Sequence, residues 1–150
     1  MSATPRVALV SVGVGRVQRG FERWARDLHG ILGPQIGLTL WKSAGEESAQ
    51  ERVPPLLRPI TNLVRGLPLG SQEYQRDCIA FALGMIPALL RKEYDVIHVI
   101  DPPLAKVLAN LRRVLPFPAR LLYTDGCSTP PDLYPHVHAP RRLLQRLGWR

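Results

Sequence analysis

The sequence predicts an α/β fold with a mainly parallel sheet and helices on both faces. Apolar runs of four to seven residues alternate along the chain with longer runs whose apolar residues recur at helical spacing. The first apolar run, 7–12, is largely β-branched and shows no polar alternation. That pattern is typical of a parallel strand buried on both faces. Strands that alternate with helices in this way form a parallel sheet covered on both sides.

The chain opens with an expected strand over 7–12, a glycine-spaced loop over 13–20 and a helix over 21–32. One apolar stripe of the helix is expected to pack on the sheet: Phe21, Trp24, Ala25, Leu28 and Leu32. In open α/β sheets ligands bind at the loop that follows a strand, because the next helix offers free N–H groups and a partial positive charge. This opening unit is therefore the first candidate for a binding site.

The later segments are predicted to extend the same sheet. Further strands are expected over 37–41, 94–100 and 119–124, and further helices over 71–92, over 104–115 and near the end of the chain. Pro87 is expected to kink or split the long helix. The proline-rich stretch 52–70 is predicted to be irregular, with a short strand or helical turn near 60–64. We therefore assign residues 1–150 to a single Rossmann-like domain, a three-layer sandwich.

The charge of the chain limits the classes of partner. The formal net charge is +8, and nearly all basic residues are arginines. An arginine-rich surface suits phosphate groups or an anionic membrane, and a merely solvated surface is the alternative. The basic stretch with Arg141, Arg142 and Arg146 is the candidate contact with anionic lipid. Long arginine blocks with interleaved aromatic residues are missing, which argues against nucleic acid as a partner.

The cysteines and the hydropathy pattern point to a cytoplasmic protein. Cys78 and Cys127 form no Cys-x-x-Cys pair and do not make a structural zinc site alone, so neither a metal nor a cofactor is predicted. No stretch reaches the roughly 20 apolar residues of a membrane span, and no signal peptide is recognisable. The expected location is the cytoplasm, with peripheral attachment to the inner membrane face as the alternative.

The glycine-spaced loop departs from two common phosphate-binding motifs. Gly15 and Gly20 have Walker A spacing, but Phe21-Glu22 follows instead of lysine and a hydroxyl residue. A dinucleotide fingerprint requires glycine where Gln18 stands, and an acidic residue where the second strand ends in Trp41-Lys42-Ser43. A non-enzymatic or dinucleotide-binding Rossmann-like module therefore stays as the alternative interpretation.

Three short motifs resemble the N-terminal half of the family 4 retaining glycosyltransferases, which have the GT-B fold. Arg19-Gly20-Phe21-Glu22-Arg23 is similar to their Gly-Gly-x-Glu-Arg junction, with Arg19 in place of the first glycine. Tyr94-Asp95-Val96-Ile97-His98 resembles a frequent strand of that family. Thr124-Asp125-Gly126 stands where the family usually has Thr-His-Gly, so Asp125 replaces the histidine. The resemblance covers the chain from about residue 5 to about residue 128.

The resemblance implies one half of a GT-B enzyme. Such an enzyme transfers a hexose from a nucleotide-sugar donor to a sugar or lipid-linked acceptor with retention of configuration, and it requires no metal. This chain would be the acceptor-binding half, and a C-terminal donor-binding domain with a Glu-x7-Glu signature would follow it. Catalysis depends on positioning and on stabilising the leaving diphosphate, mostly through that second domain. The 150 residues alone are therefore expected to have little or no transferase activity.

The ends of three predicted strands supply the candidate site residues. Glu22 and Asp125 are the candidate catalytic residues, which would accept hydrogen bonds from sugar hydroxyls. The alternatives are an ordinary acid in the first turn of a helix for Glu22 and a turn former for Asp125. The candidate substrate- and phosphate-binding residues are Gly15, Arg19, Gly20, Asp101 and Gly126.

Overall fold

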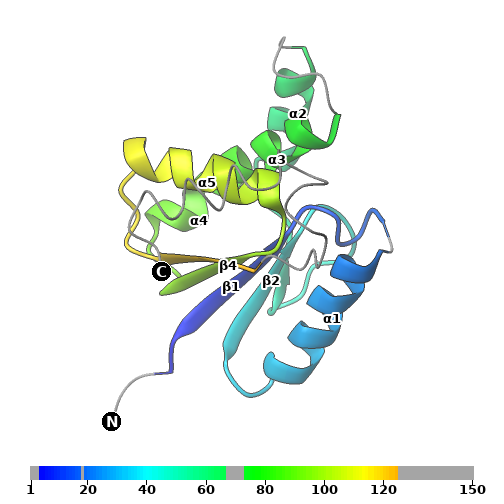
Figure 1. Ribbon diagram of the computed structural model, residues 1–150, viewed down its shortest axis with the longest axis vertical. Helices are drawn as coiled ribbons and strands as arrows, with labels where there is room; N and C mark the ends of the chain where they lie inside the picture. Colours follow the sequence, from blue (N-terminus) through cyan, green and yellow to red (C-terminus); the bar gives the residue numbers. More distant parts are fainter. Residues whose placement is uncertain (1–3, 18, 67–72, 125–150) are drawn as a thin grey trace, which may run out of the picture.

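The computed structural model describes residues 4–17, 19–66 and 73–124, which form one α/β unit (Figure 1). Its five strands lie in the order β3-β2-β1-β4-β5, and every neighbouring pair is parallel. The strands are β1 (Arg6–Ser11), β2 (Gly37–Lys42), β3 (Glu51–Arg52), β4 (Val96–Val99) and β5 (Arg120–Tyr123). The helices are α1 (Gly20–Leu32), α2 (Leu57–Arg65), α3 (Glu73–Gly84), α4 (Ile86–Leu90) and α5 (Pro102–Val114). The predicted α/β class with a parallel sheet is confirmed.

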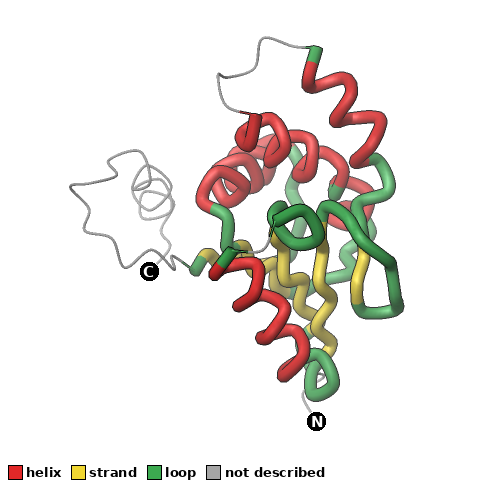
Figure 2. Tube along the Cα trace, turned by 90° about the vertical axis from the view of Figure 1, so that its right-hand side faces the viewer, coloured by secondary structure: helices red, strands yellow, loops and turns green. Residues whose placement is uncertain are grey.

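Helices cover both faces of the sheet, which gives the predicted three layers. α1 packs on one face, and α3, α4 and α5 lie on the other (Figures 1 and 2). Leu9 and Leu40 face α1, where they pack with Ala25. Ala8 and Val10 face the opposite side and belong to the larger core. β1 is thus buried on both faces, as its unbroken apolar run predicts.

The packing face of α1 agrees in part with the predicted apolar stripe, because Ala25 is buried and Leu28 and Leu32 pack against the same core cluster. Phe21 and Trp24 were expected against the sheet, yet 37% and 39% of their surfaces are exposed. Glu22 and Ala25 are the buried residues of this helix. Glu22 and Ala25 lie three residues apart on one side of the helix, and this side faces the sheet. Gly13 has no side chain, so it leaves room for the Glu22 carboxylate. The Trp24 ring makes an edge contact with His98, with 6.0 Å between the ring centroids.

Prolines define the helices between β3 and β4. The long helix expected over 71–92 is split at Met85 into α3 and α4, and Pro87 lies in the first turn of α4, where a missing N–H disrupts nothing. α2 occupies part of the stretch predicted to be irregular, and it extends the helical turn that was one of the two options expected near 60–64. Its Pro59 also lies near the helix start, so the proline content of this stretch was misleading. The proposed cap Ser71 lies outside the described residues.

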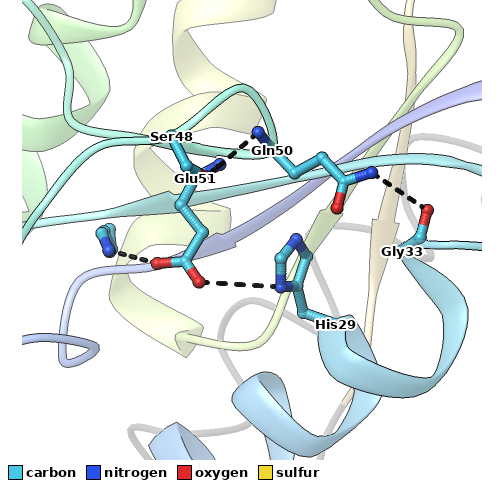
Figure 3. Close-up of polar contacts among 6 residues, drawn as sticks. His29, Gly33, Ser48, Gln50 and Glu51 are labelled. Carbon is cyan, nitrogen blue, oxygen red and sulfur yellow. Dashed lines mark hydrogen bonds and ion pairs between the residues drawn. The ribbon is translucent and has the colours of Figure 1, made fainter.

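Polar contacts hold the short edge strand β3 to the rest of the fold (Figure 3). The Glu51 carboxylate forms an ion pair with the Lys42 ammonium and lies 3.9 Å from His29 Nδ1 of α1. Gln50 Nε2 donates to the Gly33 carbonyl at 3.5 Å. The Lys42 side chain is only 7% exposed, so Glu51 neutralises a buried charge. These side-chain contacts add to the backbone pairing of β3 with β2.

Glu51→Gln is expected to lower the free energy of unfolding by about 1–3 kcal/mol, because it leaves the buried Lys42 ammonium without a counter-charge. The matched control is Glu46→Gln, which neutralises an exposed carboxylate of the same loop and is expected to change stability by less than about 0.5 kcal/mol. Urea unfolding at neutral pH measures both. Equal effects of the two substitutions would show that the Lys42–Glu51 pair contributes nothing to stability.

Candidate functional site

The candidate site lies where the strand order reverses. β1 is central, with β2 on one side and β4 on the other, so the loops that follow β1 and β4 leave the same edge of the sheet. This topological switch point is the usual ligand site of open α/β sheets. At this edge Asp101 lies between the end of β4 and the start of α5, and Val12 begins the loop after β1.

Asp101 connects these two loops to α3. Its Oδ2 accepts a hydrogen bond from the Val12 N–H at 2.9 Å, and its Oδ1 accepts one from the Tyr74 hydroxyl. The residue is only 5% exposed. Both carboxylate oxygens are thus engaged within the chain, and this geometry gives Asp101 a structural role. Its role as a direct ligand of substrate stays a prediction.

Burial controls the protonation of this network. Burial raises the pKa of Asp101, and the nearby Glu22 charge raises it further, while the hydrogen bonds from Tyr74 and Val12 act in the opposite direction. Burial and the Asp101 charge also raise the pKa of the Tyr74 hydroxyl, which therefore stays protonated and donates to Asp101. Cys78 lies in the same region, and burial raises the pKa of its thiol. A thiol of this kind is a poor nucleophile at neutral pH.

Glu22 is buried beside this network without a full set of partners. It is 7% exposed, and its Oε2 is buried and accepts no hydrogen bond from the part of the chain that the structure describes. The carboxylate lies over Gly13, where an added Cβ would overlap Glu22 Oε1. Gly13 therefore creates the space that Glu22 occupies. Two acidic side chains, Glu22 and Asp101, consequently lie close enough to influence each other at the switch point.

A groove of about 530 Å³ opens at the start of α1, and we call it the α1 groove. Its lining residues are Val17, Arg19, Gly20, Glu22, Arg23, Arg26 and Asp27. No side chain caps the N-terminus of α1, so its first N–H groups are open to a ligand. A Cβ at Gly20 would meet no atom within 4 Å, which shows that the space above this turn is free.

The loop after β1 is rigidly placed against the loop after β2. Gly15 has a φ of +90°, and an added Cβ would overlap the Ala44 carbonyl. The Ser43 N–H donates to the Val14 carbonyl at 3.2 Å. Gly15, predicted to bind phosphate, thus has a packing role in this structure.

The structure brings together part of the predicted site. Arg19, Gly20 and Glu22 line the α1 groove, whereas Asp101 lies inward of it. Asp125 and Gly126 lie outside the described residues. Gly13 and Tyr74 were missed. The glycine directly after the apolar run was a usable signal for Gly13, but Tyr74 is 27 residues from Asp101 in the chain and carries no local signal.

The described residues contain neither a metal-binding cluster nor a membrane-spanning helix. No three His, Cys, Asp or Glu side chains in 4–17, 19–66 and 73–124 gather in a way that would hold a metal ion. Over the same ranges, no helix has the length and apolarity needed to cross a membrane.

Comparisons with known proteins identify no relative. The chain matches no protein-family model, and neither a curated protein nor a solved structure matches it.

Proposed function

We propose that this chain is the acceptor-binding half of a glycosyltransferase that moves a hexose from a nucleotide sugar to an acceptor. The supporting observation is the buried Glu22 carboxylate, which has one oxygen without a hydrogen-bond partner among the described residues and lies at the edge of an open groove. The partners in this proposal are a nucleotide-sugar donor, a sugar or lipid-linked acceptor and an anionic membrane surface. The proposed location is the cytoplasm, with attachment to the inner membrane face as an option.

The position of Glu22 is costly unless a ligand uses it. A buried carboxylate oxygen that accepts no hydrogen bond raises the free energy of the folded state. Groups of this kind concentrate at binding and catalytic sites, where the ligand supplies the missing partner. A carboxylate accepts several hydrogen bonds, and the hydroxyl groups of a sugar are suitable donors. In this proposal Glu22 binds and orients the acceptor hydroxyls.

The start of α1 suits the anionic part of the donor. Its uncapped N–H groups carry the positive end of the helix dipole, and Arg19 adds a full positive charge beside them. Gly20 leaves the space above the first turn open, so a diphosphate could approach the backbone. In this proposal these groups stabilise the charge that develops on the leaving diphosphate. Most of the remaining contacts would come from a second, donor-binding domain.

Glu22→Gln is expected to separate binding from stability. The substitution keeps the shape but removes the buried charge, so the free energy of unfolding should stay unchanged or rise slightly. Hexose binding should weaken by roughly tenfold or more, because a charge-assisted hydrogen bond is lost. Titration calorimetry with glucose, mannose and galactose measures binding, and urea unfolding measures stability. Glu46→Gln, which removes an exposed carboxylate outside the α1 groove, is the matched control.

The same titrations test the alternative function. UDP-glucose and GDP-mannose represent the donors, and NAD represents a dinucleotide. Binding of NAD without any response to sugars or nucleotide sugars would favour the dinucleotide-binding module and contradict the proposal. Hexose transfer by the 150-residue chain alone would contradict its assignment as one half of an enzyme.

A further inference from the structure

A second and larger groove lies on the other side of the loop after β1. It has a volume of about 840 Å³ and runs from the carboxyl ends of β2 and β3 to α2, so we call it the α2 groove. Its polar lining includes Arg16, Ser43, Glu47, Arg58, Asn62 and Arg65. A volume of this size is in the usual range of small-molecule sites. The proposed function described above does not use it.

The arginines reach the α2 groove from two elements. Arg58, Asn62 and Arg65 are spaced by four and three residues on α2, so they lie along one side of this helix. Arg16 comes from the loop after β1. The Gly15–Ala44 packing described above fixes the backbone of that loop next to Arg16. The groove therefore has cationic groups on a helix and on a rigid loop.

These cations are only partly neutralised. Arg58 is exposed and forms no ion pair with any residue of 4–17, 19–66 or 73–124. Arg65 Nη2 lies 3.8 Å from Glu73 Oε1, and both side chains are more than half exposed, so this pair is weak. Arg16 is held by Asp77 at 2.7 Å.

The lining contains a single acid among its described residues, Glu47, and Glu47 Oε1 already accepts a hydrogen bond from the Val53 N–H at 2.8 Å. Asp77 pairs with Arg16 and the exposed Glu73 lies near Arg65, so Arg58 is the guanidinium group of this groove without an ionic partner among the described residues. A guanidinium group can form two parallel hydrogen bonds to an anion.

We propose that the α2 groove binds the phosphoryl group of a phosphorylated acceptor. This inference rests on the proposed function and narrows its acceptor to a phosphorylated sugar or polyol. Guanidinium groups match the geometry of phosphate oxygens, and Arg58 is available to bind them. Neighbouring residues of one loop line the two grooves, Arg16 the α2 groove and Val17 the α1 groove. In this proposal one acceptor places its phosphate beside Arg58 and its hydroxyl groups near Glu22.

Paired ligands test this inference on the full 150-residue chain. Titration calorimetry compares glucose 6-phosphate with glucose, and fructose 6-phosphate with fructose, at low salt. We expect each phosphorylated sugar to bind at least tenfold more tightly than its partner. Arg58→Gln should remove most of that gain and leave the unphosphorylated sugars unaffected. Arg113→Gln removes the same charge from an exposed position that lines neither groove, and it should change nothing.

Two further probes identify the source of the phosphoryl group. Inorganic phosphate should compete with the phosphorylated sugars. Phosphatidylcholine vesicles containing phosphatidylglycerol represent a lipid headgroup. Arg58-dependent binding to these vesicles, without binding of the sugar phosphates, would assign the phosphoryl group to a lipid-linked acceptor. The inference is overturned if Arg58→Gln and Arg113→Gln behave alike toward every phosphorylated probe.

The outcomes separate this inference from the proposed function. Sugar binding could depend on Glu22 while the phosphorylated and unphosphorylated sugars bind with the same affinity. That result would support the proposed function and contradict the inference. Arg58-dependent binding of inorganic phosphate, with no response to any sugar, would contradict both the proposed function and the acceptor inference that rests on it.

Discussion

Gly15→Ala is expected to lower the free energy of unfolding by about 2–4 kcal/mol, the combined effect of backbone strain and a steric overlap. Gly15 has a φ of +90°, which an alanine adopts only at a cost. The new methyl group would also overlap the Ala44 carbonyl, which is backbone and has little freedom to move away. Urea unfolding followed by circular dichroism measures the loss.

Gly30→Ala is the matched control for this substitution. Gly30 lies inside α1, and an added Cβ there meets no atom within 4 Å. Alanine at this position is expected to raise stability by about 0.5–1 kcal/mol, because glycine is a poor helix former. If both substitutions stabilise the chain, the two loops are not packed backbone against backbone as described. The loop after β1, which lines both grooves through Arg16 and Val17, would then not be held in place by this packing.

Asp101→Ala is the second substitution with a large expected effect. It leaves the buried Val12 N–H without an acceptor and frees the Tyr74 hydroxyl, so the free energy of unfolding should fall by about 2–4 kcal/mol. Tyr74→Phe removes one of the two bonds and should cost about 1 kcal/mol. Asp27→Ala, on the exposed side of α1, is the control and should stay within about 0.5 kcal/mol of the parent chain. An Asp101→Ala value equal to the control would contradict the proposed connection between β1, β4 and α3.

The pH dependence of stability gives an independent test of the same network. Because burial raises the pKa of Asp101, the folded chain holds this proton more tightly than the unfolded chain. The contribution of Asp101 to stability is therefore largest below the unfolded pKa of about 4 and is lost as the pH rises through the higher folded pKa. Asp101→Asn cannot titrate. The stability of the parent chain relative to Asp101→Asn should thus fall as the pH rises, and a difference that does not change with pH would contradict the raised pKa.

The sequence was most informative about the strands. The apolar run 7–12, the weak alternation over 37–41 and the largely apolar segments 94–100 and 119–124 predicted β1, β2, β4 and β5 to within about two residues of their observed ends. A run without polar alternation is informative because it is typical of a strand buried on both faces, as β1 is. β3 was not expected. It consists of the polar residues Glu51 and Arg52, and its pairing depends on β2 and on contacts to Lys42 and His29. Residues of this kind carry no periodic signal.

The sequence was less informative about the site. The loop and the start of the helix were placed at a strand end from local pattern, and Glu22 was singled out by the resemblance of its motif to the glycosyltransferase junction. The burial of Glu22 depends on Gly13, which a hydropathy pattern does not distinguish from a turn residue. The arginine-lined α2 groove depends on α2, whose prolines suggested an irregular segment. Such features arise from tertiary packing, which overrides local propensity.

The proposed function requires sugars and nucleotide sugars to bind at the switch point of this sheet. Two-dimensional NMR of the isotope-labelled chain tests it most directly, with glucose, glucose 6-phosphate, UDP-glucose and NAD added separately. We expect sugar ligands to shift the amide signals of residues 13–17 and of the first turn of α1, and we expect Glu22→Gln to abolish the shifts caused by glucose. Shifts that appear only with NAD, or sugar-induced shifts away from both grooves, would contradict it.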